Sequence, residues 1–120
     1  MCISKIVIIG EGESQKKLQE LFSKVDLKVV TSALDQDYTQ QASEADMVLE
    51  AVPEDIDLKK AIFKKCDVVC PQQAILATTT VNPWVTHLAA ATKRPEKVIG
   101  LNFTKNPFEE KYFVQIVKGL

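Results

Sequence analysis

The stretch KIVIIGEGESQKKL, residues 5–18, begins as a phosphate-binding loop does. A run of branched apolar residues ends in a Gly-x-Gly, as a buried strand does before a loop that opens a helix. In a dinucleotide fold the first glycine makes the tight turn, and the second lets the backbone approach a pyrophosphate. Gly10 and Gly12 fit these two roles, but Gln15 stands where a third glycine would let the helix pack closely. The loop therefore indicates a cofactor site in which the third glycine is replaced by a glutamine.

Two glutamates of this loop, Glu11 and Glu13, work against a bound phosphate. A helix N-terminus carries about half a positive charge, which attracts either a phosphate or a carboxylate. Two unit charges about 4 Å apart repel by about 1 kcal/mol in water and by more in a dry site. Two interpretations stay open: the carboxylates stabilise the helix start without any ligand, or a cofactor binds with reduced affinity.

The end of the second predicted strand lacks the acidic residue that a dinucleotide fold uses to bind the adenosine ribose. Thr31 or Ser32 stands there, and no arginine nearby suggests a 2′-phosphate. Asp35 and Asp37 reach this point only if the following loop folds back. We therefore expect NAD to bind weakly, with no preference for NADP.

The cysteines and the single histidine offer little chemistry. Cys2, Cys66 and Cys70 fit reduced thiols better than a disulfide framework, which prefers even counts. Cys66 and Cys70 could share a helical face as a redox or metal pair, but no second ligand cluster supports this, so we expect buried structural residues. His87 is expected to be exposed, and no metal site is predicted.

Length and composition suggest one ordinary globular domain. The 120 residues leave room for a single core, and the net charge of -1 gives no electrostatic reason to bind nucleic acid or an anionic membrane. No apolar run approaches the roughly 18 residues that span a bilayer, and the start lacks a signal-peptide layout. A cytoplasmic location is expected.

Short apolar runs alternate with amphipathic stretches, which predicts an α/β fold with a mostly parallel sheet covered by helices on both faces. The connection between Leu101 and Tyr112 is too short for a helical crossover, so the last strand is predicted to be antiparallel. Helices are expected around residues 18–25, from Ile56 onward, and over Pro83–Ala91 with Asn82 as N-cap. The predicted strands are Lys5–Ile9, Leu27–Thr31, Met47–Ala51, Ala74–Thr78, Lys97–Leu101 and Tyr112–Val117.

From residue 45 onward the order of motifs, ADMVLEAVPEDIDLKKAIF, then PQQAILATTT, then RPEKVIGLNF, resembles the NAD-binding domain of 3-hydroxyacyl-CoA dehydrogenases. This resemblance implies a Rossmann-type fold over residues 1–120 and NAD as cofactor. In the family a separate helical domain follows, which completes the acyl-CoA site; we expect it to be absent here. The helical insertion that many members carry between the second and third strands is also expected to be absent.

The resemblance implies a partly retained cofactor site. Glu54 and Lys59 stand where the family's E-x-x-x-x-K contacts the cofactor, and Ala51 and Val52 match the backbone that passes beneath it. Thr79 replaces a family asparagine that faces the cofactor. The alternative for Glu54 and Lys59 is a pair of ordinary surface charges near a helix start.

The resemblance implies that the catalytic residues are lost. The family uses a histidine to accept the hydroxyl proton, a glutamate to orient it and a serine to bind the substrate oxygen. These positions hold Asn102, Gln115 and Val81. An amide cannot act as a general base near neutral pH, whereas imidazole titrates there.

Three functions stay open. The first is an inactive, accessory or sensor domain with weak or lost NAD binding. The second is a protein-interaction module on the inherited fold, with acyl-CoA or a protein at the face that the helical domain would cover. The third is an active NAD-dependent dehydrogenase that a partner chain completes.

Overall fold

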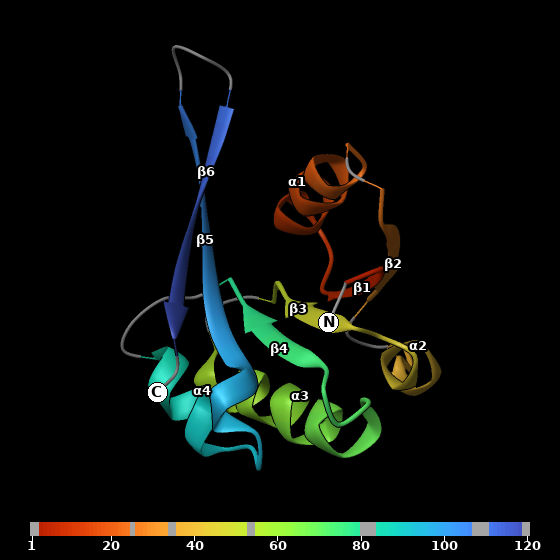
Figure 1. The fold of residues 1–120 in the computed structure, drawn as a ribbon, viewed down its shortest axis with the longest axis vertical. Coiled ribbons are helices and arrows are strands. Elements are labelled where there is room, and N and C mark those ends of the chain that lie inside the picture. Colours follow the sequence, from red (N-terminus) through yellow and green to blue (C-terminus); the bar gives the residue numbers. More distant parts are fainter. Residues whose placement is uncertain are drawn as a thin grey trace.

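A computed structural model describes residues 3–24, 26–33, 36–52, 55–79, 84–106 and 111–118 (Figure 1). Strands and helices alternate along most of the chain. In order they are β1 (Lys5–Ile9), α1 (Glu13–Phe22), β2 (Lys28–Ser32), α2 (Thr39–Ser43), β3 (Met47–Glu50), α3 (Ile56–Val69), β4 (Ile75–Thr78), α4 (Trp84–Ala90), the 3-10 turn η1 (Pro95–Lys97), β5 (Val98–Asn106) and β6 (Lys111–Lys118).

The strands form one six-stranded sheet in the order β2-β1-β3-β4-β5-β6. The strands from β2 to β5 pair in parallel, and β6 pairs with β5 in antiparallel orientation. The Rossmann-type fold and the antiparallel last strand predicted from the sequence are therefore confirmed. The strand order reverses beside β1, because β2 lies on one side of it and β3 on the other. In open α/β sheets such a reversal is where ligands bind, beyond the carboxyl ends of the strands.

The alternation of side chains along the strands builds one core on each face of the sheet. Val7 and Ile9 of β1 point into a cluster with residues of α3 and α4, while Ile6 and Ile8 point into a second cluster with Leu18 of α1. Figure 1 accordingly shows α1 on one side of the sheet and α3 and α4 on the other. Because both faces are covered, the central strands are apolar almost throughout.

Besides shifts at the ends of several elements, β5 and α2 differ from the sequence-based expectation. β5 runs to Asn106 rather than ending at Leu101, because β6 pairs with it far beyond the point where β4 stops pairing at Gly100. α2, with the sequence TQQAS, was not predicted, and only its Ala42 is buried. The predicted helix start at Asn82 and Pro83, and the helical position Val25, lie outside the described residues.

Candidate functional site

The Gly10–Gly12 loop connects β1 to α1 at the point where the strand order reverses. Gly10 has φ 137° and Gly12 has φ 95°, a region that side chains rarely adopt. A Cβ atom on Gly10 would lie 2.6 Å from the carbonyl oxygen of Ala51, whereas one on Gly12 would have no neighbour within 4 Å. Gly10 is thus required by close packing against Ala51, while the space at Gly12 is open. This open cradle fits the backbone approach that a pyrophosphate needs.

The first turn of α1 carries the features that oppose a phosphate. Gly12 is the N-cap residue and makes no side-chain cap, and Glu11 and Glu13 are both exposed. Gln15 is only 9% exposed, and its Nε2 donates a 3.2 Å hydrogen bond to Oε1 of Gln19. A buried side chain therefore fills the position where a dinucleotide fold has its third glycine.

In the part of the chain that the structure describes, the end of β2 supplies hydroxyl groups and no acid. Ser32 is buried; its Oγ donates to the carbonyl of Ala33, and its own carbonyl accepts the N–H of Gly10 at 2.9 Å. Asp37 lies before α2, where Oδ1 accepts the N–H of Thr39 at 3.0 Å. Hydrogen bonds from Thr39 lower the pKa of Asp37, so its carboxylate is engaged at the start of α2. Asp35 lies outside the described residues.

A buried polar cluster, which the sequence analysis did not single out, forms at the carboxyl end of β3. Glu50 is fully buried. Its Oε2 accepts the N–H of Val52 at 2.8 Å and the Nζ of Lys59 at 2.6 Å, while Oε1 accepts the hydroxyl of Thr78 at 2.6 Å. The only signal in the sequence was an acidic residue inside the apolar run MVLEA.

Lys59, a predicted cofactor contact, belongs to this cluster. Its side chain has no exposed area, so the alternative interpretation of a solvated surface lysine is wrong. Nζ also donates to the carbonyl of Val52 at 3.2 Å. A buried charge is tolerated when it is paired and its hydrogen bonds are satisfied, and Glu50 meets both conditions here. Direct contact of Lys59 with a cofactor stays a prediction.

The buried cluster of Glu50 and Lys59 holds the backbone of Ala51 and Val52 in place. Glu50 and Lys59 bind the N–H and the carbonyl of Val52, and the N–H of Ala51 donates to Ile9 of β1 at 2.8 Å. Both residues are 5% exposed. The segment predicted to pass beneath a cofactor therefore lies directly against Gly10, where the glycine loop begins.

The remaining predicted cofactor residues have different outcomes. Thr79 lies just after β4, is partly buried, and donates its N–H to the carbonyl of Glu50 at 3.1 Å, so it adjoins the same cluster. Glu54 lies outside the described residues, as does Val81, which was predicted to stand at the family's serine position.

The two residues predicted to stand at the positions of the family's histidine and glutamate lie on β5 and β6. Asn102 of β5 is paired in register with Gln115 of β6. Asn102 is partly buried. The strand register therefore brings these two predicted positions opposite one another.

The described part of the chain shows neither a metal site nor a membrane helix. No group of three or more His, Cys, Asp or Glu residues that could hold a metal ion occurs among these residues. His87 of α4 is exposed, as predicted. Within the same ranges, no helix has the length and apolar character needed to cross a membrane.

Comparison with known proteins identifies the family of the chain and agrees with the fold. Residues 8–120 match the family described as "3-hydroxyacyl-CoA dehydrogenase, NAD binding domain". A probable 3-hydroxybutyryl-CoA dehydrogenase of Bacillus subtilis is 40% identical over 81 residues, which are 68% of this chain and 28% of that protein. A 3-hydroxyadipyl-CoA dehydrogenase of Escherichia coli is 43% identical over 76 residues, 63% of this chain and 16% of that protein. The chain therefore aligns with a minor part of each relative.

Solved structures share the fold over nearly the whole chain. The 3-hydroxybutyryl-CoA dehydrogenase of Escherichia coli K12 superimposes with a TM-score of 0.71 at 23% identity, covering 97% of this chain and 32% of that one. The (S)-3-hydroxybutyryl-CoA dehydrogenase of Ralstonia eutropha gives 0.68 at 24% identity, covering 99% of this chain and 55% of that one. NAD is the cofactor of this domain family, which confirms the cofactor predicted from the resemblance. The chain belongs to the 3-hydroxyacyl-CoA dehydrogenase family, of which it carries the NAD-binding domain.

Proposed function

We propose that this domain does not oxidise 3-hydroxyacyl-CoA by itself and serves as an accessory or sensor domain that binds NAD weakly. The observation that supports this most is the pairing of Asn102 with Gln115 at the two positions of the family's acid–base pair. Neither amide accepts a proton near neutral pH. General-base catalysis contributes about 10²- to 10⁴-fold to the rate of a reaction, so its loss alone removes most of the turnover.

The cofactor would be held by the glycine loop and the segment beneath it. Gly10 and Gly12 would accommodate the pyrophosphate, and Ala51 and Val52 would support the cofactor from below. Bound NAD supplies a hydride acceptor. The exposed charges of Glu11 and Glu13, together with the absence of an acid at the end of β2, support a low affinity.

A second candidate function is a protein-interaction module. Among the described strands, β6 lies at the edge of the sheet beside β5, and its Ile116 is 64% exposed. An open sheet edge with an exposed apolar side chain is suited to an added strand or an apolar partner surface. Under this proposal a protein, or an acyl-CoA, occupies the side of the domain that carries β5 and β6.

The third function, an active dehydrogenase completed by a partner chain, would need the partner to supply a proton acceptor. For the first two functions we propose a location in the cytoplasm.

A turnover assay tests the main proposal. The purified chain is incubated with NAD and 3-hydroxybutyryl-CoA at neutral pH, and NADH is followed by its absorbance, with the Bacillus subtilis relative as the positive control. We expect no NADH above the enzyme-free blank. Clear NADH production by this chain would overturn the proposed lack of activity.

A calorimetric titration with NADH tests the second half of the proposal. We expect a dissociation constant well above the low-micromolar range. Low-micromolar binding would contradict weak affinity, and complete absence of binding would favour the interaction module over a sensor.

A further inference from the structure

We propose that α3 and α4 form a second binding site, which takes the phosphate group of a small phosphorylated molecule. The site is an open groove with a volume of about 360 Å³, lined by Lys60, Lys64, His87, Ala90 and Ala91. Volumes of roughly 300–1,000 Å³ are typical of sites for small molecules, so the groove has room for a small organic phosphate. None of these residues belongs to the glycine loop, so the site does not depend on NAD binding.

The two cations of the groove come from one face of α3. Lys60 and Lys64 are four residues apart in this helix, a spacing that places their side chains next to each other. Lys64 is exposed and Lys60 is partly exposed. In the part of the chain that the structure describes, neither lysine forms an ion pair. Two like charges at this spacing repel each other, and an anion bound between them replaces this repulsion by attraction.

The neighbouring helix, α4, supplies a third polar group and the space for a ligand. His87 lies in the last turn of α4 and is exposed. An imidazole N–H donates a hydrogen bond in both the neutral and the cationic form, so it can bind a phosphate oxygen in either. Ala90 and Ala91 have small side chains, which leaves the groove open. The C-terminal end of a helix carries about half a negative charge, which the two full charges of the lysines outweigh.

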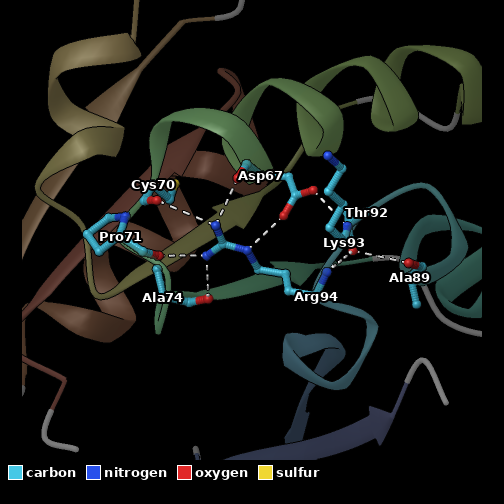
Figure 2. A network of polar contacts seen from close by, with 8 residues as sticks. All are labelled: Asp67, Cys70, Pro71, Ala74, Ala89, Thr92, Lys93 and Arg94. Atoms are coloured by element: carbon cyan, nitrogen blue, oxygen red, sulfur yellow. Dashed lines mark hydrogen bonds and ion pairs between the residues drawn. The ribbon is translucent and has the colours of Figure 1, made fainter.

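The acids of α3 that lie one turn from the lysines do not neutralise them. The carboxylate of Asp67 is already bound by Arg94 and by the backbone of Lys93 (Figure 2). Its Oδ1 accepts a hydrogen bond from Nε of Arg94 at 2.8 Å, and its Oδ2 accepts the N–H of Lys93 at 2.7 Å. Among the described contacts, the exposed Asp57 forms no ion pair with Lys60. Because the whole chain has a net charge of -1, the excess of positive charge at the groove is local.

A phosphate group suits these donors better than a carboxylate does. A phosphate monoester carries a charge of about -1.5 to -2 at neutral pH and has three strong acceptor oxygens. It can therefore engage two ammonium groups and an imidazole at the same time. Lysine binds phosphate as a point charge, through three donors that rotate to reach it. A carboxylate brings a single charge and two oxygens, so one of the two lysines would stay without a full counter-charge.

His87 provides a specific reporter for this site, since it is the only histidine of the chain. Its ring C–H signals are followed by NMR while inorganic phosphate, glycerol phosphate or acetate is added at fixed pH and ionic strength. We expect both phosphates to shift these signals with saturation in the millimolar range, and acetate to bind more weakly. Signals that do not move, that move without saturation, or that respond to acetate as strongly as to phosphate would overturn the proposal. A response to inorganic phosphate alone would overturn the assignment to a phosphate ester.

Two double variants separate a defined site from a general effect of charge. Lys60→Gln/Lys64→Gln removes both cations of the groove and keeps residues that favour a helix. Half-saturation of the His87 signals should then need at least about tenfold more phosphate, because two charged donors are lost. Lys16→Gln/Lys17→Gln removes the same charge from exposed positions of α1, on the other face of the sheet, and should respond as the wild type does.

An equal loss of binding in both double variants would contradict a site at this groove. Circular dichroism checks that each variant is folded, and the titration of the wild-type chain decides the main question without them. Phosphate that binds at the glycine loop instead is detected separately, through the backbone amide signal of Gly12. A failure of NAD to bind therefore leaves this test unaffected.

Discussion

At the scale of single residues, Glu11 and Glu13 are exposed at the start of α1, and we propose that their carboxylates weaken the binding of a phosphate by the loop. Replacing both by alanine removes two negative charges beside the N-terminus of α1. We expect NADH to bind severalfold more tightly, because the repulsion of about 1 kcal/mol per close pair is lost. Calorimetric titration of the Glu11→Ala/Glu13→Ala variant against the wild type measures this difference.

Glu20→Ala is the matched control, since Glu20 is an exposed acid in the second half of the same helix. It changes the charge of α1 without changing its first turn, so we expect NADH affinity close to that of the wild type. An unchanged affinity in the double variant would count against the electrostatic explanation and would favour Gln15 as the main obstacle.

Lys59 permits a sharp prediction about stability at the same scale. Lys59→Met leaves the fully buried carboxylate of Glu50 without its cation. Breaking a buried pair in this way costs about 3–5 kcal/mol, and we expect a fall of that size in the free energy of unfolding, measured in urea. Lys64→Met, an exposed position on α3, should change it by no more than about 0.5 kcal/mol. Equal effects of the two substitutions would show that the buried Glu50–Lys59 pair does not stabilise the fold.

At the scale of elements, Arg94 connects the C-terminal end of α3 to the start of β4. Arg94→Lys keeps the charge but loses the planar fork that reaches Asp67, Pro71 and Ala74 together. We expect the free energy of unfolding to fall by about 2–4 kcal/mol, since several buried carbonyls lose a charged donor. Thermal unfolding measures the loss.

The neighbouring residue supplies the control for this prediction. Lys93 is exposed, and its N–H rather than its side chain binds Asp67, at 2.7 Å. Lys93→Arg should therefore leave the melting temperature nearly unchanged. If Lys93→Arg lowered the stability as much as Arg94→Lys does, the loss could not be assigned to the hydrogen bonds of the Arg94 side chain.

Periodicity in the sequence predicts the elements well where apolar residues determine them. β1 was predicted with its observed bounds, and α3 from its start, because their apolar residues follow the strand and helix periods. α2 was missed because TQQAS has no apolar pattern, and its one buried side chain is an alanine. The extent of β5 was missed because it depends on pairing with β6, a contact that no local pattern encodes.

The candidate site was likewise predictable only where its residues follow a local pattern. The glycines and the apolar strand before them follow a local pattern, and the structure places them where the strand order reverses. The Glu50–Lys59 pair joins residues nine positions apart on two different elements, so only the packing of α3 on the sheet brings them together. Resemblance to the family suggested Lys59 as functional, but nothing in the sequence predicted its burial.

At the scale of the whole molecule, Asp46, just before β3, binds the residues at the start of β1 by hydrogen bonds. Its Oδ2 accepts hydrogen bonds from the N–H and the hydroxyl of Ser4, both at 2.9 Å, and from the N–H of Lys5 at 3.0 Å. These bonds hold the pKa of Asp46 below its ordinary value of 3.8, and the bond from the N–H of Ser4 contributes most. A carboxylate whose pKa is lowered by folding adds stability above its unfolded pKa, and this stability is lost as the pH falls through the folded value.

Asp46→Asn should therefore weaken the acid sensitivity of the fold. We expect the variant to be less stable than the wild type at about pH 7 and the difference to shrink towards about pH 2, where the native carboxylate is also protonated. Urea unfolding across this range provides the comparison, with Asp57→Asn, an exposed acid in the first turn of α3, as the control. A constant difference at every pH would assign the effect of Asp46 to something other than its charge.

The hydrogen bonds of Glu50 and Lys59 to the backbone of Val52 should slow the exchange of its amide hydrogen with solvent. Val52 follows the end of β3, where a backbone amide would normally exchange its hydrogen for deuterium quickly, yet its N–H donates to a buried carboxylate. Its deuterium uptake should then be as slow as that of the central strands and should require opening of the whole domain. The segment beneath the cofactor site would thus behave as part of the rigid framework, so any movement that admits a ligand has to come from the other side, where Gly12 faces open space.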